Sequence, residues 1–234
     1  MSVLKKQKKF TKKFLMKNEF ISILVTNFNK EKFIKKTLNS IYKQNFKNFE
    51  VILFDDCSND NSLEIIKKFK KVKLIKNKIK YSEHAPINQI NGLYNAFKKS
   101  RGKIICLLDG DDFFKSNKLS EIHNYFKKNI QTLNVYNKPI TSKKKFRFKK
   151  KYTTKTIWPT IFPTSCISTR RNFMKNFFDN SKKNEFHNLE IDARITIFSK
   201  FFHDEYNILD KKLTIYNHDA NEINSNINKF SKKC

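Results

Sequence analysis

The sequence predicts an α/β fold built on a mostly parallel sheet with helices on both faces. In its first half, short apolar runs rich in β-branched residues alternate with amphipathic segments of helical spacing. Alternation of this kind is typical of parallel sheets, because parallel neighbours must be joined by a crossover, usually a helix. A length of 234 residues suits one domain of this class.

The elements of the first half follow from these patterns. Strands are expected over residues 20–26, 49–54, 72–77 and 103–109, and the last of these is apolar enough to be buried on both faces. Helices are expected over residues 30–44, 62–71 and 87–100.

Beyond residue 112 the periodicity weakens. We expect helices over residues 118–129 and 188–202 and short strands over residues 133–137 and 211–219. Pro159 and Pro163 favour a loop or an edge segment over residues 158–168, since proline cannot donate to a sheet ladder. The basic segment 141–156 has no secure periodicity and is expected to be a loop. Residues 1–18 form a basic N-terminal extension with the spacing of a short amphipathic helix, so the domain proper is assigned to residues 19–234.

The chain is strongly cationic, with 50 Lys and Arg residues against 21 Asp and Glu residues and a formal net charge of +29. Such a surface suits an anionic partner, although a codon bias toward lysine explains the charge equally well. A nucleic-acid module is the weaker alternative, because nearly all the cations are lysines and no nucleic-acid-binding signature is present. A membrane-surface module remains open, since residues 1–18 and 141–156 could contact anionic lipid.

The four cysteines form no CxxC pair, which argues against both a disulfide framework and a zinc site. The sequence has no run of about 18 apolar residues and no apolar leader. We therefore expect a cytoplasmic protein, with peripheral contact at the inner face of the membrane as an extension of that expectation.

Polar residues gather where three predicted strands end, at residues 26–29, 55–60 and 109–112. The ligand crevice of a parallel α/β sheet lies outside these carboxyl ends. Asp109 and Asp111 flank a glycine, and an all-oxygen pair favours Mg²⁺ or Mn²⁺ bridging to phosphate. The alternative is that Asp60, Ser62, Asp112 or Ser116 caps a following helix. Neither a GxGxxG nor a Walker A sequence is present, which excludes dinucleotide dehydrogenases and P-loop kinases.

Three segments in register carry a resemblance to a known family: ISILVTNFNKEKFI, SIYKQNFKNFEVILFDDCSNDNS and SRGKIICLLDGDDFFKSNKL. They resemble the nucleotide-sugar-binding half of family 2 glycosyltransferases. The resemblance implies a GT-A (Rossmann-like) fold with a nucleotide-sugar-binding half over residues 19–120 and a smaller acceptor-binding half over residues 121–234. It also implies metal-dependent, inverting transfer of a sugar from a nucleotide diphosphate, commonly uridine diphosphate, to a hydroxyl of a glycan or lipid-linked glycan.

The resemblance assigns roles to strand-end residues. It implies that Thr26 and Phe28 line the base and ribose site, with Asn29 beside them. Asp56 would accept a hydrogen bond from the base and Asp109 would approach the ribose.

The same resemblance makes Asp111 the ligand of Mg²⁺ or Mn²⁺. Three features depart from the family pattern, and one of them is that the proline often found before the position of Phe28 is absent. Phe28 stands where tyrosine is usual, and Cys57 stands where glycine is frequent, which is tolerable if the backbone φ there is negative.

The second half contains one informative segment, residues 189–194, which resembles the acidic motif that supplies the catalytic base in inverting members. Asp192 matches that position best and Glu190 is the alternative. A carboxylate favoured by the helix macrodipole explains Asp192 equally well. His218 could contact the diphosphate or simply lie at the surface. A GT-A-like protein that binds nucleotide without catalysis is the main rival of the enzyme.

Overall fold

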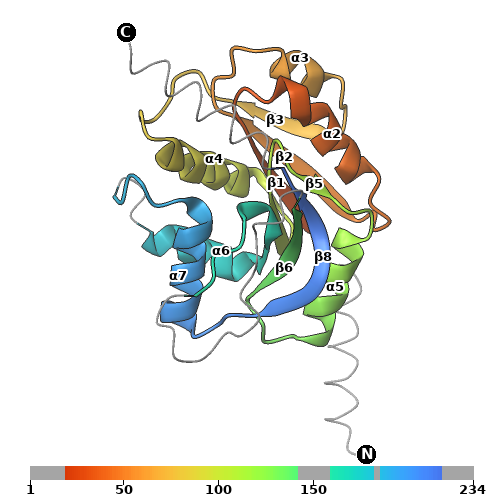
Figure 1. Cartoon of the computed structure of the whole chain (residues 1–234), viewed down its shortest axis with the longest axis vertical. Helices are drawn as coiled ribbons and strands as arrows, with labels where there is room; N and C mark the ends of the chain where they lie inside the picture. The colour runs from red at the N-terminus through yellow and green to blue at the C-terminus, as the bar shows by residue number, and fades with distance from the viewer. Residues whose placement is uncertain (1–18, 142–158, 182–184, 218–234) are drawn as a thin grey trace, which may run out of the picture.

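The computed structural model describes residues 19–141, 159–181 and 185–217. An eight-stranded sheet in the order β3-β2-β1-β4-β7-β6-β8-β5 runs through the molecule (Figure 1). Its strands are β1 (Ile21–Asn27), β2 (Phe49–Asp55), β3 (Val72–Lys76), β4 (Ile104–Asp109), β5 (Phe113–Phe114), β6 (Asn134–Thr141), β7 (Ile167–Arg170) and β8 (Ile208–Tyr216). The helices are α2 (Glu31–Tyr42), α3 (Ser62–Lys67), α4 (Ala85–Lys99), α5 (Lys118–Lys128), α6 (Arg171–Asn180) and α7 (Ile191–His203), with a 3-10 turn η1 (Thr164–Cys166).

The first four strands in space, β3, β2, β1 and β4, are parallel, as the alternating sequence pattern predicts. Their register aligns the carboxyl ends. Thr26 lies beside Asp109 on one side, and Asn27 lies beside Asp55 on the other. The polar segments after β1, β2 and β4 therefore meet at one edge of the sheet.

Alternate residues of β1 and β4 point to opposite faces, and each face is covered by three helices (Figure 1). On one face, Ile23 and Cys106 pack with apolar residues of α2, α3 and α5. On the other face, Leu24 and Leu107 pack with those of α4, α6 and α7. The prediction that helices cover both faces of the sheet is confirmed.

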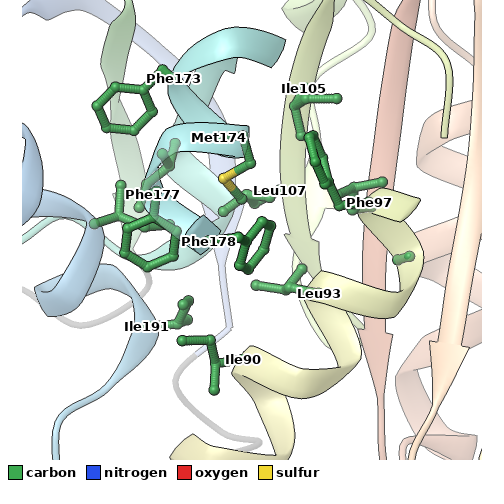
Figure 2. Close-up of a cluster of buried hydrophobic side chains, with 14 of the residues drawn as sticks. Ile90, Leu93, Phe97, Ile105, Leu107, Phe173, Met174, Phe177, Phe178 and Ile191 are labelled. Atoms are coloured by element: carbon green, nitrogen blue, oxygen red, sulfur yellow. The ribbon is translucent and has the colours of Figure 1, made fainter. Parts of the chain in front are cut away.

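Helix α6 was not expected from the sequence, yet it contributes to the core that contains Leu24 and Leu107. Figure 2 shows Met174 and Phe178 of α6 beside Leu107 of β4, with Leu93 of α4 close by. The rings of Phe178 and Phe97 lie 5.4 Å apart between centroids. Truncating a core residue of this kind to alanine costs about 2–5 kcal/mol.

The expectation of a loop or edge segment over residues 158–168 is wrong at its end. Ile167 and Ser168 begin β7, which pairs antiparallel with β4 on one side and with β6 on the other. Both prolines lie upstream of the strand, before or at the start of η1, so they remove no donor from the ladder. Strand β6 is longer than expected, and β8 has the expected length of nine residues but begins three residues earlier. These two strands pair in parallel, and the antiparallel pairs of β7 with β4 and β6 make the sheet mixed.

Several expectations lie outside the described residues: the extension 1–18, all of the basic segment after Thr141, and His218. Among the described cysteines, Cys57, Cys106 and Cys166 are free thiols, in line with the sequence. None of the helices in the described ranges is both long and apolar enough to cross a membrane.

Candidate active site at the strand ends

Asp109 lies at the end of β4, and two side chains donate hydrogen bonds to its carboxylate. Thr26 Oγ1 at the end of β1 is 3.1 Å from Asp109 Oδ1, and Gln89 Nε2 of α4 is 2.8 Å from the same oxygen. The backbone N–H of Asp109 donates to Ser165 Oγ at 3.0 Å. The structure thus joins the predicted residues Thr26 and Asp109, and it adds Gln89 and Ser165 to their surroundings.

Gly110 allows the turn at the end of β4, residues 109–112 and here called the acidic turn, to lie directly against β1. Its N–H donates to the carbonyl oxygen of Thr26 at 2.9 Å, and its own carbonyl accepts from Thr37 Oγ1 at 2.8 Å. A Cβ atom here would lie 2.8 Å from Asn27 Oδ1. A side chain would therefore displace the turn that carries Asp109 and Asp111.

Asp111 forms an ion pair with Lys30, the last residue before α2. Lys30 Nζ lies 2.5 Å from Asp111 Oδ2, and the two side chains are only 14% and 11% exposed. This ion pair was not predicted, because a lysine before a helix is usually exposed to solvent.

The acidic turn concentrates negative charge where water is largely excluded. Burial, followed by the carboxylates of Asp112 and Asp111, raises the pKa of Asp109 well above its usual range. Burial and the Asp111 carboxylate raise the pKa of Asp112 to about 7. Asp112 does not cap α5, as one alternative expected; its Oδ1 accepts from the backbone N–H of Asn217 at 2.9 Å. A nearby cation would offset this charge.

The acidic turn fits a divalent cation of the Mg²⁺ or Mn²⁺ type. Such ions take one or two protein carboxylates and complete their shells with phosphate oxygens and water, so the carboxylates of Asp111 and Asp109 have the chemistry of suitable donors. Within the described ranges, no group of three or more His, Cys, Asp and Glu side chains forms a cage that could hold a metal by itself. The ion would therefore need ligand oxygens from elsewhere.

Two carboxylates of the acidic segment after β2 hold the local structure. Asp55 accepts from Asn27 Nδ2 at 2.8 Å and from Ser58 Oγ at 2.6 Å, which ties the ends of β1 and β2 together. Asp60 accepts from the N–H groups of Glu31 and Ser62, the first residues of α2 and α3, in agreement with the capping alternative.

Asp56 is a carboxylate of this segment that contacts neither helix start. Its Oδ1 accepts from Asn77 Nδ2, just after β3, at 3.0 Å. The predicted base-contacting residue is therefore held by a neighbouring strand end.

Phe28 and Asn29 follow β1 in different roles. Phe28 is 39% exposed, and Lys80 Nζ lies 3.8 Å from the centroid of its ring in a cation–π contact. Asn29 adopts the left-handed conformation with φ of 51°, and its Oδ1 accepts from the N–H of Asn59 at 2.9 Å. Its carboxamide oxygen is thus engaged in joining two loops.

Cys57 corrects an expectation about the backbone. Cysteine was expected to be tolerated at this position if φ is negative, but φ is +61°. This is the left-handed region that glycine adopts freely and other residues adopt at a cost of about 1–2 kcal/mol. The loop keeps the conformation suited to glycine although the residue is cysteine, because the bonds around Asp55 and Ser58 hold it.

Asp192 lies in the first turn of α7, and its electrostatics connect it to the acidic turn. Burial raises its pKa to about 6. The hydrogen bond that its carboxylate accepts from the N–H of Ala193 at 2.7 Å acts in the opposite direction and lowers the pKa. Its charge also contributes to the raised pKa of Asp109, after burial and the carboxylates of Asp112 and Asp111. Glu190, the alternative base, is exposed as a residue, and partial desolvation of its carboxyl group raises its pKa although the charge of Arg194 opposes the rise. Asp192 is therefore the carboxylate of α7 whose charge acts on Asp109.

Lys118 is a buried residue near the acidic turn whose structural role was not predicted. It is fully buried at the start of α5, and its ammonium donates to the carbonyl of Ser165 and to Thr214 Oγ1, the latter at 2.9 Å. Burial lowers its pKa to about 8. Since Ser165 also binds the backbone of Asp109, Lys118 links β8 and η1 to the acidic turn.

The parallel sheet with acidic residues at its carboxyl ends defines an α/β protein of the GT-A class. Its fold matches the crystal structure of residues 1–349 of TarS from Staphylococcus aureus, with a TM-score of 0.64 at 20% identity over 84% of this chain and 60% of that one. It also matches the mannosyltransferase PcManGT from Pyrobaculum calidifontis in complex with GDP-Man and Mn²⁺, with a TM-score of 0.57 at 14% identity over 88% and 61% of the two chains.

The chain belongs to glycosyl transferase family 2, which matches residues 22–206. A relative is the poly(ribitol-phosphate) beta-N-acetylglucosaminyltransferase TarS of S. aureus, 33% identical over 43% of this chain and 18% of its own length. Another is the UDP-Glc:alpha-D-GlcNAc-diphosphoundecaprenol beta-1,3-glucosyltransferase WfaP of Escherichia coli, 36% identical over 45% of this chain and 41% of its own. The matched region therefore spans less than half of these relatives.

Proposed function

We propose that this protein is a metal-dependent, inverting glycosyltransferase that moves a sugar from a nucleotide diphosphate, most simply uridine diphosphate, to an acceptor hydroxyl. The observation that supports the proposal is that the charge of Asp192 in α7 acts on Asp109 of the acidic turn and contributes to its raised pKa. These residues come from opposite halves of the chain, and catalysis requires a base and a donor site in one place.

The donor would bind along the ends of β1, β2 and β4. Phe28 offers a ring face to the base, and Asp56 offers an acceptor to its ring N–H. Thr26 and Asp109, already hydrogen bonded to each other, lie where the ribose would contact the sheet. Asn29 would act by holding the loop after β1 against Asn59, because its side-chain oxygen is engaged there.

Asp111 would hold Mg²⁺ or Mn²⁺. When bound, such an ion offsets the negative charge that gathers on the leaving diphosphate. The acidic turn has the composition to favour it, since its carboxylates are poorly hydrated and repel one another.

Asp192 would accept the proton of the acceptor hydroxyl as that oxygen attacks the sugar carbon. A pKa of about 6 leaves the carboxylate ionised at neutral pH and more basic than an ordinary aspartate. General-base catalysis of this kind typically contributes about 10² to 10⁴-fold. Attack on the face opposite the diphosphate in one displacement inverts the configuration.

The acceptor is proposed to be a glycan or lipid-linked glycan at the inner face of the membrane. Two relatives are named for poly(ribitol-phosphate) and for a diphosphoundecaprenol acceptor, and both names contain phosphate. A net charge of +29 favours an anionic acceptor or an anionic lipid surface.

The test is a screen of nucleotide sugars with Mn²⁺ or Mg²⁺ for release of free nucleotide diphosphate. Release by the wild type and its loss in Asp192→Asn supports the enzyme. Tight nucleotide binding without release favours the non-catalytic alternative. Tighter binding to nucleic acid than to anionic vesicles, with no nucleotide binding, favours a nucleic-acid module.

A further inference from the structure

Lys30 is held in place against the carboxylate that would bind a divalent cation. Its backbone N–H donates to Ser62 Oγ at 2.9 Å, and its carbonyl accepts from the N–H groups of Phe33 and Ile34 in the first turn of α2. Its side chain passes Gly110, where an added Cβ would lie 3.4 Å from Lys30 Cγ, and ends 2.5 Å from Asp111 Oδ2.

A divalent cation and the Lys30 ammonium would repel each other if both contacted the Asp111 carboxylate. Both carry positive charge, and both side chains of the pair are more than 85% covered, so water screens the repulsion poorly. Moving Lys30 away would leave a mostly buried ammonium without an anion, which is strongly unfavourable. In the absence of nucleotide, a cation would therefore find the Asp111 carboxylate already paired with Lys30.

A nucleotide diphosphate would supply the missing anion. It carries negative oxygens to the same strand ends, so Lys30 could exchange the Asp111 carboxylate for the diphosphate while the cation takes Asp111. The charges of Lys30, Asp111, the ion and the diphosphate would then be mutually compensated.

We propose that Lys30 occupies Asp111 until a nucleotide diphosphate arrives, so that the divalent cation and the nucleotide bind together rather than independently. Lys30 then pairs with the diphosphate and positions it. This inference rests on the proposed function for the identity of the ligand, but its test measures binding and not turnover.

The experiment compares the wild type with Lys30→Met and with the control Lys32→Met, an exposed lysine two residues along α2. Binding of Mn²⁺ without nucleotide is followed by electron paramagnetic resonance of the free ion. Binding of uridine diphosphate in the presence of EDTA is followed by calorimetry. Lys30→Met is expected to bind Mn²⁺ at least about tenfold tighter and uridine diphosphate at least about tenfold more weakly, each equal to about 1.4 kcal/mol. The control is expected to match the wild type in both.

Opposite changes in the two affinities distinguish this role from general structural damage, which would weaken both. In the double variant Lys30→Met/Asp111→Asn the gain in Mn²⁺ affinity is expected to vanish. Unchanged or weaker Mn²⁺ binding by Lys30→Met overturns the inference, as does a gain that survives in the double variant. In those cases release of nucleotide diphosphate by the wild type would leave the proposed function standing. A wild type that neither binds uridine diphosphate nor releases it from a nucleotide sugar refutes the proposed function, and the inference with it.

Discussion

Replacing Asp192 with asparagine separates the electrostatic cost of this carboxylate from its proposed chemistry. Asparagine has nearly the same shape and keeps an oxygen that can accept from the N–H of Ala193. It removes the charge and the ability to take a proton. We expect transfer to fall by at least about a hundredfold with donor affinity retained.

The same substitution is expected to stabilise the fold. The pKa of Asp192 rises from 3.8 to about 6 on folding because burial disfavours its charged form. A rise of about two pKa units corresponds to an upper bound of about 3 kcal/mol in the free energy of unfolding. Since the folded carboxylate holds its proton more tightly, the wild type loses stability as pH rises from about 4 to about 6. The gain in Asp192→Asn should therefore be full above pH 6 and absent below pH 4.

The assay has two parts. Denaturant unfolding of the wild type and variant at pH 4 and pH 8 measures the stability difference. Initial rates of nucleotide diphosphate release across pH 5 to 8 measure the chemistry, and the wild-type rate should fall as pH drops through about 6, where Asp192 becomes protonated.

Glu190→Gln is the matched control, because it removes a neighbouring carboxylate that is exposed. It should retain most of the transfer rate. Near wild-type transfer by Asp192→Asn, combined with loss of transfer in Glu190→Gln, would refute the assignment of the base. A stability gain that is the same at pH 4 and pH 8 would refute the electrostatic reasoning.

Substitutions at three further positions test the strand ends. Asp111→Asn should abolish Mn²⁺-dependent binding of uridine diphosphate in calorimetry while the circular dichroism spectrum is unchanged; undiminished affinity would remove Asp111 from the metal site. Cys57→Gly should raise the free energy of unfolding by about 1 kcal/mol, because φ is +61° there, and Cys57→Val should lower it; thermal melts that rank the two variants in the reverse order would contradict this. Gly110→Ala should destabilise the protein by about 1–3 kcal/mol and weaken uridine diphosphate binding, because its methyl group would meet Asn27 Oδ1 at 2.8 Å; wild-type stability and affinity together would show that the turn has room to move.

The first half of the fold was predictable because its signals are local. Strands β1, β2 and β4 are mainly apolar runs, β3 alternates apolar residues with lysine, and the helices between the strands have amphipathic spacing. The rule that parallel strands need helical crossovers then places their carboxyl ends together. This reasoning located the acidic turn and the polar ends of β1 and β2 without reference to any contact.

The second half was harder to predict because its strands depend on partners that are distant in sequence. Strand β7 has four residues and follows two prolines, and it is central only because β4 and β6 flank it. Helix α6 contains Phe173, Met174, Phe177 and Phe178, which fit a helical face, but its value lies in filling the gap between α4 and α7.

The sequence by itself determined the fold class and which carboxylates stand at the strand ends, since local periodicity and motif spacing suffice for both. Only the tertiary structure decided what those carboxylates contact. Lys30 approaches Asp111 across 81 residues of sequence, and Gln89 reaches Asp109 from a helix on the face of the sheet. Hydrogen bonds, ion pairs and loss of solvent act over a few ångströms in space, so the pairing of residues and the pKa of Asp192 exist only once the chain has folded.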